Sequence, residues 1–261
     1  MARSFSLSLA AADIVAELLG VNIRLFPFEI PSVGQLQEDR LRIARAVFAD
    51  LAKRGLVRRE GLDPELELAV RTLSDYVIAV AVMGTVDKNR KIYARASATG
   101  DTGVLAVKEA QSIRLELIRP TALALTLVGL LPKAEAGPGQ SVTITQPARA
   151  KHRRPEDNEQ NLFGPVRSTK GSSEQQLRIA TNYLSRPRTG TGFFAVSGRD
   201  RAGREVRAGG LTWLDTDAGR YLTLTRAQSA EDEVSCTLTP ADSARLTHQL
   251  GEMIESVAPR R

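Results

Sequence analysis

In the first half of the chain, the apolar residues follow a helical period and then strand periods. Asp63-Pro64 puts a capping carboxylate before proline, the arrangement favoured at a helix start, and Leu66, Val70 and Leu73 follow at helical spacing. The next residues predict four strands joined by tight turns, because apolar runs and alternations are separated by turn residues. These strands are expected near residues 76–84, 91–96, 104–110 and 113–117, and a helix with Leu123, Leu127 and Leu130 on one side follows Pro120.

The second half repeats this order of elements. A helix with Leu177, Ala180 and Leu184 follows the capping-box pair Ser173 and Gln176. Four strands joined by turns come next, near residues 191–198, 205–214, 221–226 and 234–238. Residues 239–242 then cap a last helix with an apolar stripe made of Leu246, Leu250, Met253 or Ile254, and Val257.

Each half therefore has the order helix, four strands, helix, and we expect the two halves to be quasi-symmetric. Tight turns join antiparallel strands, so the predicted fold class is α+β, with a twisted central antiparallel sheet flanked by helical bundles. The two halves, residues 1–131 and 172–261, are expected to form one compact domain. The first of them also has an additional N-terminal section. Its expected elements are a strand at 5–7, a helix at 10–19, a strand at 25–30 and a long helix at 34–54.

Residues 132–171 interrupt this pattern. Five of the twelve prolines and one aromatic residue, Phe163, lie there, a composition typical of a flexible linker. Seven Lys and Arg against four Asp and Glu give the segment +3 of the net charge of +6. The basic cluster Lys151–Arg154 lies in its middle. Two hypotheses stay open for this cluster, namely an electrostatic tether that could bind nucleic acid and ordinary solvated charge.

The remaining composition is that of a globular protein, with 42% apolar and 25% charged residues. No apolar run approaches the roughly 20 residues that span a bilayer. Asp13 and Glu17 interrupt the apolar N-terminal stretch, which favours a strand and an amphipathic helix over a signal peptide. The single cysteine, Cys236, permits no intramolecular disulfide. We therefore predict a cytoplasmic location.

The run from Leu211 to Arg226 places two acids, Asp215 and Asp217, beside Gly219. A calcium loop needs a bidentate carboxylate at its twelfth position, and Arg226 stands there. An acid pair for catalysis would need a nucleophile or an apolar pocket beside it, and none is evident. The pattern favours a hairpin turn in which the two acids accept backbone N–H bonds and Gly219 takes positive φ.

No other segment supplies a catalytic pattern. The chain has no phosphate-binding loop, no dinucleotide fingerprint, no HExxH, no CxxC and no GxSxG. Cys236 is expected to be a buried, inert thiol, Trp213 a packing residue and His248 an exposed side chain. We predict no enzyme activity, no catalytic residue, no metal site and no cofactor.

Four segments, taken in order, resemble the EspG family, the chaperones associated with ESX (type VII) secretion in actinobacteria. The similar stretches are "FSLSLAAADIVAELLG", "RLFPFEIPSVG" with "RLRIARAVFADLAKRGL", "GREVRAGGLTWLDTDAGRYL" and "LTPADSARLTHQLGEMIESV". "DTDAGRY" is the most recognisable piece, and the likeness covers most of the chain outside residues 132–171. The resemblance implies a central antiparallel sheet with helical bundles, built from two quasi-symmetric halves.

The resemblance also implies a function. Members bind a PPE protein, usually paired with a PE protein, and keep the apolar tip of its helical bundle soluble until export. The expected partner is a PPE-like protein or a PE/PPE heterodimer, with no small-molecule substrate, no nucleic acid and no membrane insertion; a homodimer is left open. Under this hypothesis we predict partner contacts at Tyr93, Arg95, Thr99, Gly100, Asp101, Thr102, Arg245 and Gln249. A nucleic-acid-binding protein that uses the basic linker is the alternative.

Overall fold

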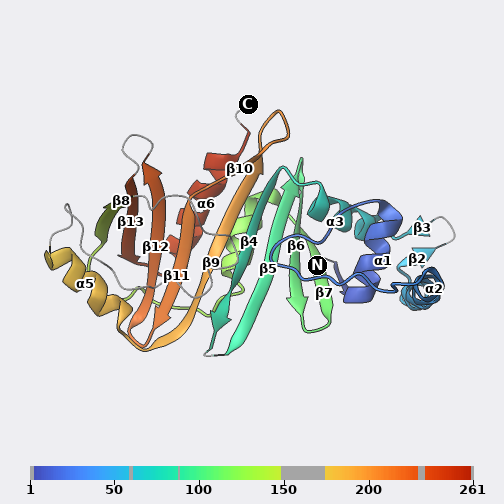
Figure 1. The fold of residues 1–261 in the computed structure, drawn as a ribbon, viewed down its shortest axis with the longest axis horizontal. Helices are drawn as coiled ribbons and strands as arrows, with labels where there is room; N and C mark the ends of the chain where they lie inside the picture. The colour runs from blue at the N-terminus through green and yellow to red at the C-terminus, as the bar shows by residue number, and fades with distance from the viewer. Residues whose placement is uncertain (1–2, 59–60, 88, 148–173, 229–232, 260–261) are drawn as a thin grey trace.

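The structure is a computed structural model that describes residues 3–58, 61–87, 89–147, 174–228 and 233–259. Its centre is an eleven-stranded sheet in which every neighbouring pair of strands is antiparallel (Figure 1). The strand order is β1-β7-β6-β5-β4-β9-β11-β12-β13-β8, and β10 pairs with β9. The predicted α+β class with a central antiparallel sheet is therefore confirmed.

The strands alternate with short turns and the helices flank them. The strands of the large sheet are β1 (Ser4–Ser8), β4 (Ile78–Val86), β5 (Arg90–Thr99), β6 (Thr102–Glu109), β7 (Ser112–Ile118), β8 (Val142–Pro147), β9 (Arg188–Arg199), β10 (Glu205–Arg207), β11 (Gly210–Thr216), β12 (Gly219–Gln228) and β13 (Glu233–Pro240). A separate small hairpin consists of β2 (Val57–Arg58) and β3 (Gly61–Leu62). The helices are α1 (Leu9–Leu19), α2 (Gln37–Lys53), α3 (Pro64–Ser74), the 3-10 turn η1 (Pro120–Ala122), α4 (Leu123–Val128), α5 (Glu174–Leu184) and α6 (Ser243–Val257).

The first of the four repeated strands in each half, β4 and β9, pair at the centre of the sheet. From this pair, β5, β6 and β7 extend to one side, and β11, β12 and β13 extend to the other. The order is thus palindromic about the β4–β9 pair, and one sheet spans both halves of the chain. The quasi-symmetry of the halves themselves stays a prediction.

One face of the sheet is covered by α4 and α6. Its core contains apolar side chains of all the central strands, among them Val82, Phe194 and Trp213, packed against Leu127 of α4 and Leu250 of α6. Burial of this surface, at about 25 cal/mol per Å², is the main force holding the two halves together. The predicted apolar stripe of the last helix is confirmed, and Asp242 caps that helix through its carboxylate.

Trp213 shows why glycine interrupts the neighbouring strands. Its indole is fully buried in this core, over Gly84 of β4 and Gly192 of β9. A Cβ atom at Gly192 would lie 2.2 Å from Trp213 Cη2, and one at Gly84 would lie 2.7 Å from the same atom. Glycine at these two positions makes room for the ring, a use of strand glycine that backbone propensity alone would disfavour.

On the opposite face, the helices that the structure describes cover the two ends of the sheet. Over β7, β6 and β1, the N-terminal helices α1 and α3 pack on a second core that includes Phe5, Leu7 and Leu115. Over β12, β13 and β8, helix α5 packs on a third, smaller core through Ala180 and Tyr183. The central strands β4, β9 and β11 lie between these two covered ends (Figure 1).

Two expectations about irregular segments are wrong. Residues 25–30 form a loop, not a strand, and Phe26–Pro27 is a cis peptide bond in it. The segment 132–171 is not a linker over its described part, because β8 pairs along β13 and Ala136 bridges to Arg220. The remainder of that segment, with Lys151–Arg154 and Phe163, lies outside the described residues, as does Ser173.

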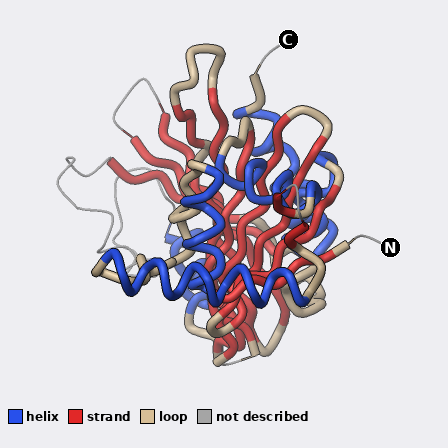
Figure 2. Tube along the Cα trace, turned by 90° about the vertical axis from the view of Figure 1, so that its right-hand side faces the viewer, coloured by secondary structure: helices blue, strands red, loops and turns tan. Residues whose placement is uncertain are grey.

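Helix α2 extends along one end of the molecule (Figure 2). Only Leu51 of its seventeen residues is buried, and Leu41 is 52% exposed. The helix therefore packs lightly on the rest of the fold. Within the described part of the chain, no helix combines the length and the apolar character needed to cross a membrane.

Candidate functional site

The central strands carry a surface that no helix of the described residues covers. Side chains alternate across a strand, so the residues next to Phe194 and Trp213 in sequence point away from the α4–α6 core. Cross-strand pairing aligns Tyr93, Met83, Phe193, Thr212 and Thr223 in one row over β5, β4, β9, β11 and β12. We call this row, together with its neighbours Ala195 and Thr225, the open face.

Ala195 is the clearest sign that the open face is accessible. It lies in β9, which has a paired strand on each side, yet it is exposed. Met83, Tyr93 and Phe193 are half-buried around it, whereas Thr212 of the same row is buried. An exposed alanine in the middle of an eleven-stranded sheet means that the sheet face above it is uncovered.

The loop from Gly20 to Leu36 forms one wall of the open face, and in Figure 1 it crosses in front of β5. Phe26 at its tip stacks on Phe193, with ring centroids 5.9 Å apart and an interplanar angle of 22°. Arg95 donates from Nη1 to the Phe26 carbonyl oxygen at 3.0 Å. Phe26 remains 48% exposed. The wall is therefore apolar at its solvent side and anchored to the sheet by a polar contact beneath.

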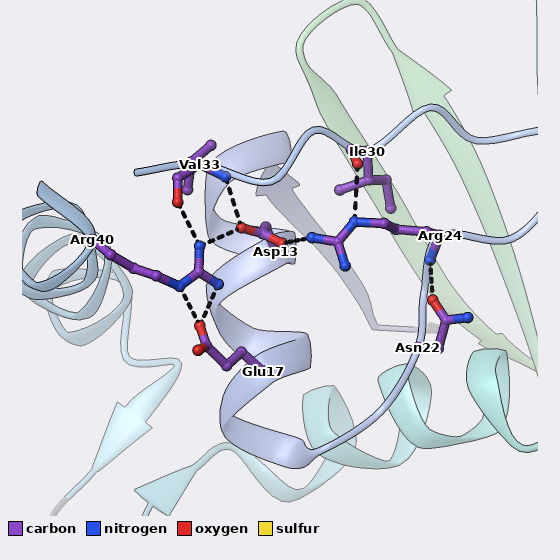
Figure 3. A network of polar contacts seen from close by, with 7 residues as sticks. All are labelled: Asp13, Glu17, Asn22, Arg24, Ile30, Val33 and Arg40. Atoms are coloured by element: carbon purple, nitrogen blue, oxygen red, sulfur yellow. Dashed lines mark hydrogen bonds and ion pairs between the residues drawn. The ribbon is translucent and has the colours of Figure 1, made fainter. Parts of the chain in front are cut away.

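A buried carboxylate fixes this loop to helices α1 and α2 (Figure 3). Asp13 of α1 is 3% exposed and accepts from the backbone N–H of Val33 at 3.0 Å and from Arg40 Nη1 at 2.9 Å. Arg24 of the loop also binds Asp13, through Nη2. Arg40 Nε donates to Glu17 at 2.6 Å. The hydrogen bonds to Glu17 and then Asp13 raise the pKa of Arg40. One carboxylate thus ties together three segments.

The structure does not bring the eight predicted contact residues together. Tyr93 lies in the row of the open face. Gln249 lies on α6, beyond the other face of the sheet, where it lines a shallow pocket with Gly210 and Leu224. Arg245, also on α6, is exposed. Contacts at Tyr93 and contacts at α6 would therefore need a partner that reaches around the sheet.

The predicted contacts at the turn between β5 and β6 lie at the end of the sheet. Gly100 and Asp101 are exposed, and Thr99 and Thr102 are half-buried. Asp101 and Thr102 line a pocket of about 500 Å³ together with the exposed side chain of Leu68. Whether partners use this turn stays a prediction.

Arg95 is not a surface residue. Its side chain is 6% exposed, beneath the Phe26 loop, and burial is the main cause that lowers the pKa of its guanidinium. From the alternation of apolar and polar residues in β5, the sequence predicts that Arg95 lies on the polar side of the strand. The loop that covers it comes from some 70 residues earlier in the chain, at Phe26. Arg95 is therefore a buried residue in this structure, and its contact with a partner stays a prediction.

The predicted hairpin turn at Asp215–Arg220 is confirmed, but Asp215 does not cap it. Thr216 Oγ1 accepts the N–H of Ala218 at 3.2 Å, and Gly219 has φ 126°. Asp215 instead forms a two-point ion pair with Arg220, at 2.6 Å from Nε and 2.9 Å from Nη2. Arg220 also donates to the Pro132 carbonyl oxygen at 2.9 Å.

This ion pair gives the stretch a structural role. Arg220 is fully buried and joins the hairpin to the chain after α4. Gly219 lies so close to this segment that a Cβ atom added to it would be 2.7 Å from Gly137 N. Tyr221 stacks on Tyr183 of α5, with centroids 4.6 Å apart. The stretch is a structural clamp, and Asp215 is not free to act on a substrate.

The other candidate side chains lie on three different elements: Asp217 in the turn between β11 and β12, Cys236 in β13 and His248 in α6. Asp217 is half exposed and lies 3.8 Å from Arg186. Cys236 is half-buried, less enclosed than expected, and desolvation raises the pKa of its thiol. His248 is exposed beside Glu252, as expected. Within the described ranges, no three His, Cys, Asp or Glu side chains are grouped to hold a metal ion.

Sequence reasoning missed the residues that shape the open face, Phe26 and Phe193. The expected strand over 25–30 hid the loop. Pro27 was the available signal against a strand, because proline has no backbone N–H to donate and is rare inside a sheet.

Comparisons with known proteins agree with this architecture. The EspG family model matches residues 8–252 of the chain. No curated protein sequence matches significantly. Among solved structures, the chain is similar to one described as the Mycobacterium tuberculosis type VII secretion system chaperone EspG5 in complex with the PE25–PPE41 dimer. The TM-score is 0.67 at 11% identity, with 98% of this chain and 97% of that chain covered. At this identity the likeness shows a shared fold.

Proposed function

Because this chain belongs to the EspG family, we propose that it is a chaperone of an ESX type VII secretion system. It binds a PPE-like helical protein, alone or paired with a PE protein, and keeps the apolar surface of that protein soluble until export. The structure described for EspG5 holds a PE25–PPE41 dimer, which supports a partner of this class. The family match lends no support to the nucleic-acid alternative.

The open face is the observation that carries this proposal. It offers Phe26, Phe193, Met83 and Ala195 as one accessible, mostly apolar surface in the middle of a rigid sheet. Apolar burial contributes about 25 cal/mol per Å², and a stable interface buries about 800 Å² on each partner. The entropic costs of association are subtracted from the free energy that this burial contributes. A helical tip laid on the central strands would gain this term, and the paired backbone beneath it needs no rearrangement.

We propose further that the protein makes and breaks no covalent bonds, uses no metal or cofactor, and acts in the cytoplasm as one domain. The engagement of Asp215 by Arg220 supports the first point, because it removes the leading candidate for a catalytic acid. The continuous sheet across β4 and β9 supports the last.

Co-expression with the PE/PPE-type proteins encoded in the same genome tests the proposal. We expect one of them to co-elute with the chain in size-exclusion chromatography. Ala195→Arg places a long charged side chain on the open face and should abolish co-elution. Leu125→Arg is the matched control, because Leu125 is 65% exposed on α4, away from the open face, and should leave the complex intact. Failure of every such protein to co-elute with the unaltered chain would contradict the proposal.

A further inference from the structure

An unusual group of cations lies at the margin of the open face. Tyr76, just before β4, is 7% exposed, and two guanidinium groups flank its ring. The Cζ atom of Arg95 lies 4.6 Å from the ring centroid, and that of Arg199 lies 4.9 Å from it. Arg199 is exposed, whereas Arg95 is buried. We call these three residues the arginine–tyrosine cluster.

Arg95 lacks the partner that a buried arginine ordinarily has. Arg95 and Arg220 are the two buried arginines among the described residues. Arg220 holds a carboxylate at two points, a backbone carbonyl and the Ser243 hydroxyl. Arg95 binds one carbonyl oxygen, that of Phe26, and its Nε has no hydrogen-bond partner. A buried charge without a counter-ion is costly, so it is normally paired.

No carboxylate on the described part of the chain takes that place. Neither Arg95 nor Arg199 has an ion pair there, within 4.0 Å. Glu205 lies opposite Arg199 in the β10–β9 pair and attracts Arg95 electrostatically, but its carboxylate is bound by Arg207, at 3.2 Å from Nε, and forms no ion pair with Arg95. Cation–π contact with Tyr76 compensates part of the charge, and burial lowers the pKa of the Arg95 guanidinium. The Ser97 hydroxyl, on the same face of β5, is also buried without a partner.

The cluster adjoins the accessible part of the sheet. Arg95 pairs across β5 and β4 with Ala81, and Ala81 pairs with the exposed Ala195 of β9. A helix tip that covers Ala195 and Phe193 would therefore bring its flanking side chains to Arg199 and Arg95. The neighbouring surface is apolar, which favours a protein segment with one acid beside apolar residues over a polyphosphate chain.

We propose that the arginine–tyrosine cluster receives a carboxylate side chain of the helical partner, an Asp or Glu next to the apolar residues that meet Phe26 and Phe193. This proposal rests on the proposed function and adds the chemistry of one contact. Arg199 meets the carboxylate at the surface. A shift of the Arg199 side chain or of the Phe26 segment then exposes Arg95 Nε, and the fork of Arg95 completes a charge-assisted pair.

Binding measurements on the complex with the co-encoded PE/PPE-type heterodimer test this. Truncating one member of a buried charge pair costs an interface about tenfold or more in Kd. We expect Arg199→Gln and Arg95→Gln each to weaken binding by about that factor. Arg45→Gln, which removes an exposed arginine on α2, is the matched control and should leave Kd unchanged. Neutralising the partner's acid should weaken binding to the unaltered chain but not to Arg199→Gln.

The outcomes separate the two proposals. If the unaltered chain binds and Arg199→Gln behaves like Arg45→Gln, the carboxylate site is wrong and the chaperone function stands. If the unaltered chain binds none of the heterodimers, the function itself is wrong. Arg199 is exposed, so its variant should fold normally and decides the matter even if Arg95→Gln unfolds. If Arg199→Gln and the neutralisation of each partner acid weaken binding additively, no acid pairs with Arg199, and the proposed contact is wrong.

Discussion

Replacing Asp215 with asparagine tests whether this acid is a structural residue. The substitution keeps the size of the side chain and removes its charge, so Arg220 is left fully buried without a counter-ion. Asp217, two residues on, supplies a matched comparison in the same hairpin. Its side chain is 53% exposed and lies 3.8 Å from Arg186.

The structure predicts very different losses of stability for these two variants. Breaking a buried ion pair from one side costs about 3–5 kcal/mol. An asparagine amide oxygen can still accept one hydrogen bond from Arg220, so we expect the lower end, about 3 kcal/mol, for Asp215→Asn. A half-exposed pair at the longer distance contributes at most about 1 kcal/mol, so Asp217→Asn should cost no more than that.

Equilibrium unfolding in urea measures the difference. With a urea dependence of about 3 kcal/mol per M, Asp215→Asn should lower the unfolding midpoint by about 1 M, and Asp217→Asn by about 0.3 M or less. In Asp215→Asn/Arg220→Gln the loss should be smaller than the sum of the two single losses, because both remove the same contact. Equal midpoints for Asp215→Asn and Asp217→Asn would refute the clamp. Loss of partner binding at unchanged stability would instead assign Asp215 a surface role.

Three further predictions follow from individual environments. Gly219→Ala should destabilise the fold, because φ is 126° and the new Cβ would lie 2.7 Å from Gly137 N, whereas alanine at the unobstructed helical position Gly251 should stabilise it by about 0.5–1 kcal/mol; thermal unfolding measures both. Asp13→Asn should speed hydrogen exchange in residues 21–36, with unchanged exchange counting against the network of Figure 3. Burial raises the pKa of the Cys236 thiol, so the stability it contributes is present below the ordinary thiol pKa and is lost as pH rises towards the raised value. Cys236→Ala should lack that loss in unfolding measured between pH 8 and 10.

Local patterns were enough to predict most strands and helices of both halves, although the single strand expected at 205–214 is divided into β10 and β11. The Asp63-Pro64 cap, the apolar run of β4 and the stripe of α6 depend on neighbours within a few residues, and each is observed as expected. The strand β8 was missed although Val142 and Ile144 alternate with polar residues and are buried. The proline-rich composition of the whole segment predicted a linker. The strand itself is only six residues long, and its pairing with β13 depends on those residues alone.

The open face could not be predicted from local patterns, because it is what the distant segments leave uncovered. Helices α4 and α6 pack on one side of the sheet, and α1, α3 and α5 cover the two ends of the other side. The edge of this uncovered region is set by the loop at Phe26, whose position depends on contacts that Asp13 makes with Arg24 and Arg40. The same covering loop decides the environment of Arg95. Arg220 obtains its carboxylate locally, because Asp215 lies opposite it in the β11–β12 hairpin. The environment of Arg95 instead depends on the distant loop at Phe26, which buries it without supplying a carboxylate.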